Sequence, residues 1–319
     1  MLEQYLAGPP SQNFMEGINS TPDFVISGIV QFFIIGKFFA LFSILFGLSF
    51  FIQMDSAANK GQDFSMRFLW RAFLLFLIGY AHQLFYRGDI LTIYAMIVPF
   101  LIPFYKMDNK WILGIAAIFF LSVPRFIAFA IWGNESIFGF PAFLDFEDPL
   151  KIAYFDTIKS GSIIEVFQQN AFYGMKTKMD FQWSFFGRFY YTFGYFLLGL
   201  WLGKIGLFQK VEVYLPRLKK SLKWILLSMV LTFGLTGAAF TMAPQPVDFS
   251  HWLQVIGLNN FDWVNLCLAL LILSGFILLY QKDFWHKRLV FFAPYGRMAL
   301  TNYVLQSIIG TFILSLIHI

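Results

Sequence analysis

The sequence predicts an all-α membrane protein, a polytopic bundle of about eight transmembrane helices with the N-terminus outside. Three observations predict this fold class. Hydrophobic residues fill 58% of the 319 positions and charged residues only 13%, whereas soluble proteins average roughly 45–50% and about 25%. The mean hydropathy is +0.66. Phenylalanine alone occupies 44 positions. A protein surrounded by water could not keep so many large apolar side chains away from its surface.

Eight apolar segments divide the chain, and each is long enough to be read as a membrane-crossing helix. They cover residues 24–53, 68–85, 89–105, 111–132, 183–208, 222–242, 261–280 and 298 to the end. We expect seven complete spans and a truncated last one, since about 20 apolar residues cross a bilayer.

Three local features modify this simple pattern. The first segment exceeds the length of one span, so we expect Gly36 and Lys37 to divide it. Pro124 removes a backbone hydrogen bond and should kink the fourth segment. Gly199 and Gly203 form a GxxxG pair in the fifth segment, a spacing typical of a close helix contact.

Lysine and arginine predict the orientation. Most of them lie in one set of connections, including Lys60, Lys219 and Lys220, and the positive-inside rule makes that side cytoplasmic. The loop 133–182 then lies outside the cell membrane, as does the start of the chain. The net charge of +5 therefore indicates orientation in a membrane and no nucleic-acid partner.

The domain organisation follows from these spans. Residues 1–313 are expected to form a single transmembrane domain, whose partner is the lipid bilayer; homo-oligomerisation is left open. Residues 314–319 match one reading frame of a common sequencing adaptor, so we expect them to be read-through and give His318 no functional weight.

Ionisable residues inside the spans are the candidate site, because each costs about 2.5–3.5 kcal/mol to insert. The predicted topology places Lys37, His82, Asp89, Arg125 and Arg188 in the outer half of the membrane. Such a set could hold an anionic group, with His82 as acid or base. The alternative is structural: Lys37 and Arg188 extend to the interface, and Asp89 pairs with a neighbouring cation.

Polar residues in the last segment are weaker candidates for substrate binding. Asn302, Tyr303 and Gln306 could instead form hydrogen bonds between helices. The single cysteine, Cys267, excludes an internal disulfide, and the sequence has no CxxC or HExxH motif. We expect no metal and no cofactor.

Four blocks resemble one family in order along the chain. They are Gly36-Lys37-Phe38 with 41–47, Ile78-Gly79 with His82 and 88–95, Gly194-Tyr195 with 198–204, and 296–303 with Gln306-Ser307. Together they resemble the YeiB-like bacterial inner-membrane proteins that carry the domain of unknown function DUF418. The resemblance places residues 243–313 within the C-terminal DUF418 region. It also implies that helices are missing at both ends.

Two functions remain open at this point. The first is transport or export of a small or envelope-derived solute. The alternative is an acyltransferase that modifies an extracytoplasmic glycan or lipid, because the resemblance implies a distant relation to membrane acyltransferases. In that case His82 and Asp89 are the catalytic candidates, while Lys37, Arg125, Arg188, Asn302, Tyr303 and Gln306 bind substrate in either case.

Overall fold

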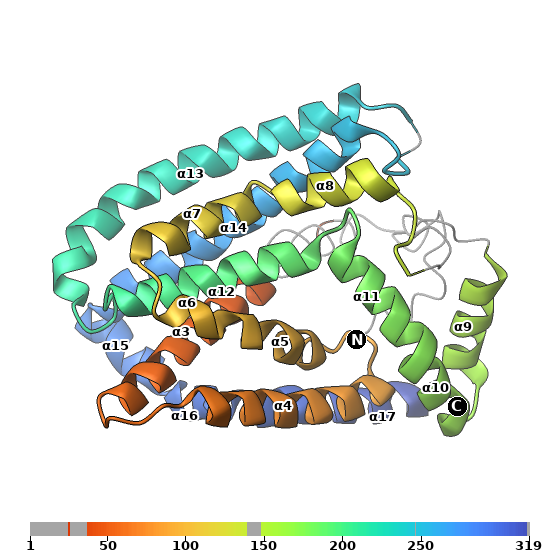
Figure 1. The fold of residues 1–319 in the computed structure, drawn as a ribbon, viewed down its shortest axis with the longest axis horizontal. Coiled ribbons are helices and arrows are strands. Elements are labelled where there is room, and N and C mark those ends of the chain that lie inside the picture. Colours follow the sequence, from red (N-terminus) through yellow and green to blue (C-terminus); the bar gives the residue numbers. More distant parts are fainter. Residues whose placement is uncertain (1–24, 26–36, 139–147, 246, 318–319) are drawn as a thin grey trace.

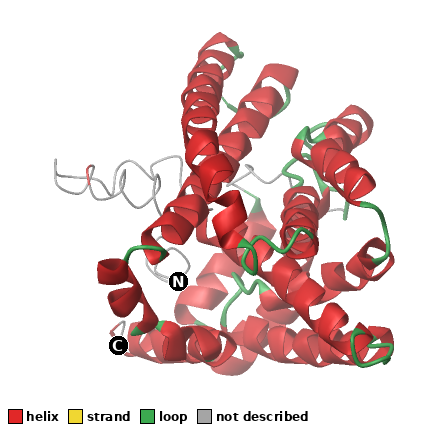
Figure 2. Ribbon diagram, turned by 90° about the vertical axis from the view of Figure 1, so that its left-hand side faces the viewer, coloured by secondary structure: helices red, strands yellow, loops and turns green. Residues whose placement is uncertain are grey.

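A computed structural model describes residue 25 and residues 37–138, 148–245 and 247–317. In these ranges every regular element is a helix, and no strand occurs (Figure 1, Figure 2). The predicted all-α class is therefore confirmed. The prediction for residues 314–319 stays untested, and residues 318 and 319 lie outside the described parts. Gly36 also lies outside them, so its role in dividing the first segment stays a prediction.

Helices occur in all eight predicted segments. In chain order they are α3 (Lys37–Ala58), α4 (Ser65–Phe85), α5 (Leu91–Ile97) with the 3-10 turn η1 (Val98–Leu101) and α6 (Ile102–Tyr105), α7 (Asn109–Phe120), α8 (Val123–Trp132), α12 (Arg188–Lys204), α13 (Val211–Met242), α14 (Trp252–Tyr280) and α17 (Ala299–Ile317). Two short helices, α15 (Asp283–Val290) and α16 (Ala293–Arg297), connect the last two.

Helix length supports fewer complete spans than the sequence predicts. Four described helices, α3, α4, α13 and α14, are long and apolar enough to cross a membrane, and the bent pair α7 and α8 would make a fifth. The third predicted span is broken into α5, η1 and α6, and α12 has only 17 residues. Several membrane-spanning helices are thus supported, while the number of about eight remains a prediction.

Close contact between α3 and α12 forms the centre of the bundle. A methyl group at Gly199 would overlap the carbonyl oxygen of Ile44, and one at Gly47 would overlap the carbonyl oxygen of Phe196. A methyl at Gly203 would meet the ring of Phe51. The close contact predicted from the GxxxG pair is confirmed, because only glycine allows the two backbones to approach this far.

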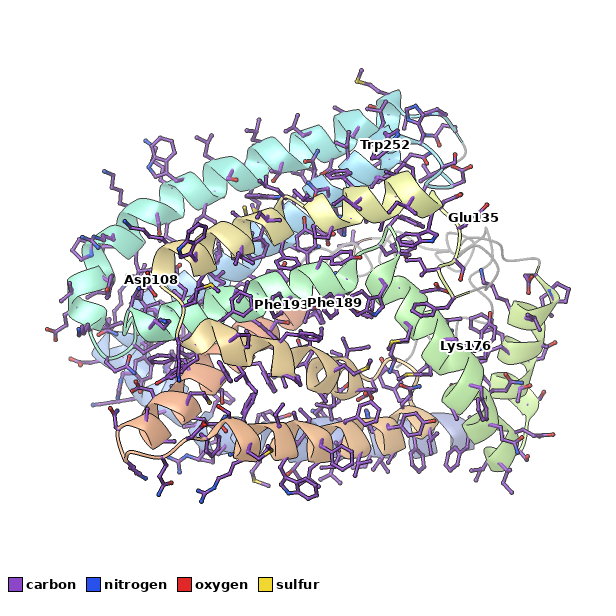
Figure 3. The ribbon with its side chains drawn as sticks, viewed as in Figure 1. Asp108, Glu135, Lys176, Phe189, Phe193 and Trp252 are labelled. Atoms are coloured by element: carbon purple, nitrogen blue, oxygen red, sulfur yellow. The ribbon has the colours of Figure 1, made fainter. Side chains whose placement is uncertain are left out.

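Aromatic rings fill the layer beside α12. Phe189 and Phe193, marked in Figure 3, lie one turn apart on that helix. Their ring centroids are 6.4 Å from Phe100 and 5.4 Å from Phe104, both in near-perpendicular pairs. Such edge-to-face packing stabilises by about 0.5–1.5 kcal/mol per pair beyond burial, so the many phenylalanines form the core of the bundle as well as its surface.

The predicted kink near Pro124 is a full break between α7 and α8. The two helices bend by 40°, and Ser122 adopts left-handed backbone angles at the break. The carbonyl of Phe120, four residues before the proline, has no helical partner to accept from. It instead accepts a hydrogen bond from Trp263 Nε1 at 2.8 Å, and the Tyr191 hydroxyl lies 3.0 Å away.

The long loop folds into helices at one end of the bundle (Figure 1). These are α9 (Pro149–Ser160), α10 (Ile163–Gln169), a π-helical turn η2 (Asn170–Gly174) and α11 (Met175–Trp183). The side chain of Asn170 donates to the carbonyl of Leu84 at 2.9 Å, and Gln83 Nε2 donates to the carbonyl of Asn170 at 3.0 Å. We call this end of the bundle, where α4 ends, the loop end.

Candidate functional site

A buried histidine and a buried aspartate meet at the loop end. His82 lies in the last turn of α4, and a tight turn, closed by a 3.1 Å bond from the Asp89 amide to the Tyr86 carbonyl, returns the chain. His82 Nδ1 is 2.8 Å from Asp89 Oδ1, and their side chains are 1% and 0% exposed. The seven-residue spacing of the two residues is therefore a direct contact.

The surroundings of Asp89 determine which ring nitrogen of His82 donates to it. Both carboxylate oxygens accept hydrogen bonds at the start of α5: from the amide of Leu91 at 3.2 Å, and from the amide and hydroxyl of Thr92 at 2.9 and 2.6 Å. A helix start favours a negative charge, and an ionised carboxylate only accepts. His82 Nδ1 must then donate, and in the neutral imidazole Nε2 is the acceptor. Nε2 is buried and has no partner among the described residues.

Two further side chains lie beside His82 and Asp89. The hydroxyl of Tyr303, on α17, accepts a hydrogen bond from the amide of Ile90 at 3.1 Å, and its ring centroid is 5.2 Å from that of His82. Lys178 Nζ, on α11, donates to Gln83 Oε1 at 2.6 Å and lies 3.9 Å from Asp89 Oδ2. Burial lowers the pKa of Lys178 to about 8, although the nearby Asp89 opposes that shift.

An apolar groove leads along α4 toward this pair. The groove has a volume of about 340 Å³ and lies between α3, η1, α4 and α17. Its lining includes Ile78 and Leu300, which precede His82 and Tyr303 by about one helical turn. At its other end lie the polar side chains of Gln53 and Arg71.

A second charged cluster joins α8, α12 and α14. Arg125, 1% exposed, donates through Nη2 to Asp262 Oδ2 at 2.5 Å and to the carbonyl of Phe186 at 2.6 Å. Arg188 Nη1 is 3.6 Å from the other carboxylate oxygen, Asp262 Oδ1. The guanidinium of Arg125 also lies over the ring of Tyr191, 5.0 Å from its centroid.

The predicted residues therefore fall into separate groups. His82 and Asp89 touch each other and Tyr303 lies beside them, while Arg125 and Arg188 share Asp262. No contact in the part of the chain that the structure describes joins Arg125 to His82 or Asp89.

The remaining candidates lie elsewhere. Asn302 donates to the carbonyl of Tyr295 at 3.1 Å, and Gln306 donates to the Tyr295 hydroxyl at 2.8 Å. The side chain of Lys37 lies outside the described atoms. The substrate-binding roles of all these residues stay predictions.

Sequence reasoning missed two charged members of these groups. Asp262 is an acidic residue within the seventh predicted span, and that unusual position was the available signal. Lys178 lies in the loop, where a lysine is ordinary and carries no such signal. The described residues contain no group of three histidine, cysteine or acidic side chains that could hold a metal ion.

A family model matches the last third of the chain. Residues 202–319 match the family described as "Protein of unknown function (DUF418)". Over this region, the chain is similar to the DUF418 family. The DUF418 region begins inside α12 and contains α13, α14 and α17, so it supplies both Asp262 and Tyr303 to the two clusters.

Two curated relatives are similar to this chain. "Uncharacterized 39.9 kDa protein in amylase 3'region" of Bacillus acidopullulyticus is 35% identical over 106 residues, which cover 33% of this chain and 31% of that relative. "Uncharacterized protein YxaH" of Bacillus subtilis (strain 168) is 28% identical over 322 residues, covering 98% of this chain and 74% of the relative. No solved structure matches the chain significantly.

Proposed function

We propose that this protein is a membrane-embedded acyltransferase that modifies an extracytoplasmic glycan or lipid, with His82 as its general base. One observation carries the proposal: Nδ1 of His82 is held by Asp89, while Nε2 is buried without a partner among the described residues. An unmet buried acceptor costs about 1–3 kcal/mol. A substrate hydroxyl that donates to Nε2 would remove this penalty.

The chemistry follows from the tautomer in which Nδ1 donates to Asp89 and Nε2 accepts. The acceptor hydroxyl gives its proton to His82 Nε2 while its oxygen attacks the acyl carbonyl. A carbon–oxygen bond forms, the bond between the acyl carbon and the leaving group breaks, and the leaving group takes the proton from the imidazolium. Asp89 keeps the ring oriented and stabilises its positive charge between these steps.

The apolar groove supports a linear donor. Ligand sites typically enclose about 300–1,000 Å³, and the groove of about 340 Å³ falls in this range. Arg71 precedes His82 by eleven positions, which corresponds to roughly 16 Å along a helix. A chain of that length could lie along α4 with its carbonyl beside His82.

The test is complementation of cells that lack the full-length gene. Lipid and glycan mass spectrometry should show one envelope component that has lost an acyl group. Wild type should restore the group and His82→Gln should not, although immunoblots show equal protein in the membrane. His286→Gln, an exposed histidine on α15, serves as the matched control and should restore it.

Transport or export of a small or envelope-derived solute is the alternative that this experiment separates. Acylation restored by His82→Gln would contradict the proposal. So would an unchanged envelope composition accompanied by accumulation of a solute on one side of the membrane.

A further inference from the structure

The cluster of Arg125, Asp262 and Arg188 carries more positive than negative charge. Both guanidinium groups approach the two oxygens of one carboxylate. Within the described residues, neither arginine forms an ion pair with any other acidic side chain. No acidic side chain of the described residues therefore compensates one of the two positive charges, in a region where Arg125 and Asp262 are 1% and 8% exposed.

The hydrogen-bonding groups of Arg125 are also incompletely used. Its Nη2 serves both Asp262 and the Phe186 carbonyl, whereas Nε and Nη1 are buried with no partner among the described residues. A guanidinium cannot lose its charge to escape this situation. Unmet donors on a buried cation indicate that an acceptor with negative charge belongs there.

Among the described residues, the Arg125 side of the cluster is more covered than the Arg188 side. The Phe186 that binds Arg125 packs against Phe185 and Phe249, with ring centroids 4.3 and 5.6 Å away. Near them Phe129 contacts Trp252, marked in Figure 3, in a perpendicular pair at 4.6 Å. By contrast, the Arg188 side chain is 24% exposed and lies over the ring of Phe39.

We propose that these three residues form a binding site for one oxyanion, a carboxylate or a phosphate group, which enters past Arg188. The fork of donors on a guanidinium matches the paired oxygens of such groups. Asp262 holds the two arginines in place when no ligand is bound, and it competes with the ligand for them. The site is separate from His82 and does not depend on acyl transfer.

Anion-dependent stability of the full-length protein in detergent tests this site. The midpoint of thermal unfolding is measured during titration with sodium acetate, sodium phosphate or sodium chloride at matched ionic strength. For wild type we expect a saturable rise with acetate or phosphate beyond that with chloride. The more effective anion tells whether a carboxylate or a phosphate is preferred.

Variants test whether the anion binds at Arg188 and Asp262. Arg188→Gln should weaken the apparent affinity at least about tenfold, equivalent to about 1.4 kcal/mol and near the lower limit for a charge-assisted hydrogen bond. Asp262→Asn should tighten binding, because it removes the internal competitor. Arg217→Gln, an exposed arginine over Tyr214, is the matched control and should bind like wild type.

A measurement without variants covers the case in which these proteins do not fold. The effective anion should protect Arg188 from modification by phenylglyoxal, as followed by mass spectrometry. Equal thermal shifts in wild type and Arg188→Gln, or no protection of Arg188, would show general salt stabilisation and overturn the proposal.

Discussion

At the scale of single residues, Asp89 is the charge on which the loop end depends. Its carboxylate accepts from His82 and from the start of α5, and it faces Lys178. Asp89→Asn should lower the free energy of unfolding by about 1.5–3 kcal/mol, the value of hydrogen bonds to charged groups. Thermal unfolding in detergent measures this loss.

A double-mutant cycle tests the proposed pairing with Lys178. In Asp89→Asn, Lys178 becomes a buried cation without its carboxylate, so adding Lys178→Met should recover part of the lost stability. The control pair, Lys178→Met with Asp262→Asn, should be additive, because no contact joins these residues in the described structure. A coupling of zero between Asp89 and Lys178 would contradict the ion pair.

The titration of Lys178 predicts a pH dependence of stability. The pKa of Lys178 in the folded protein is lowered to about 8, whereas the pKa of lysine in the unfolded chain is about 10.4. Between these values the unfolded chain binds more protons than the folded one, so stability should rise with pH in this window. Lys178→Met should lose that rise when unfolding midpoints are compared from pH 7.5 to about 10; an unchanged slope would speak against a buried, partly neutral lysine.

At the scale of helices, the contact of α3 with α12 sets the strictest requirement on sequence. Gly199→Ala should destabilise by about 1–3 kcal/mol or more, because its methyl group would overlap the backbone of α3. Gly114→Ala is the matched control in α7, where the space around the added methyl is open. It should be neutral or stabilise by up to about 1 kcal/mol through helix propensity.

The two unfolding midpoints in detergent decide this comparison. Equal unfolding midpoints of Gly199→Ala and Gly114→Ala would contradict the close contact of α3 with α12.

The helices were predictable from the sequence. The breaks within them and the ion pairs between them were predictable only in part. A long apolar run has few alternatives to a helix in a bilayer, and Pro124 marked one break by its missing amide. Pro99 and Pro103, at the starts of η1 and α6, mark the breaks after α5 in the same way. The pair of Arg125 with Asp262 spans 137 positions, so it depends on how α8 and α14 pack and no local spacing reveals it.

His82 and Asp89 were found from sequence because the turn that joins them is short. Lys178 reaches the same place from the folded loop, 95 positions after its partner Gln83. The sequence identifies residues 133–182 as a loop, which does not reveal the contacts that its helices form. The candidate site was therefore predictable in its local part, and its remote members required the fold.

At the scale of the whole molecule, the predicted orientation has a direct test. Helices α9–α11 lie at one end of the bundle, and the basic start of α13 lies toward the other (Figure 1). A reporter fused after Lys219 should be active in the cytoplasm, and one inserted after Ser160 should be active outside. A cytoplasmic signal from the Ser160 fusion would invert the topology and place the His82 pair toward the cell interior.

The hydrogen bond from the amide of Ile90 to the hydroxyl of Tyr303 joins residues 213 positions apart. It connects the turn after α4 to a helix of the DUF418 region, whose match begins only at residue 202. We therefore expect the last helix to fit only against a turn whose shape matches it. In chimeras between relatives, a transplanted last helix should work only when the turn from His82 to Thr92 travels with it.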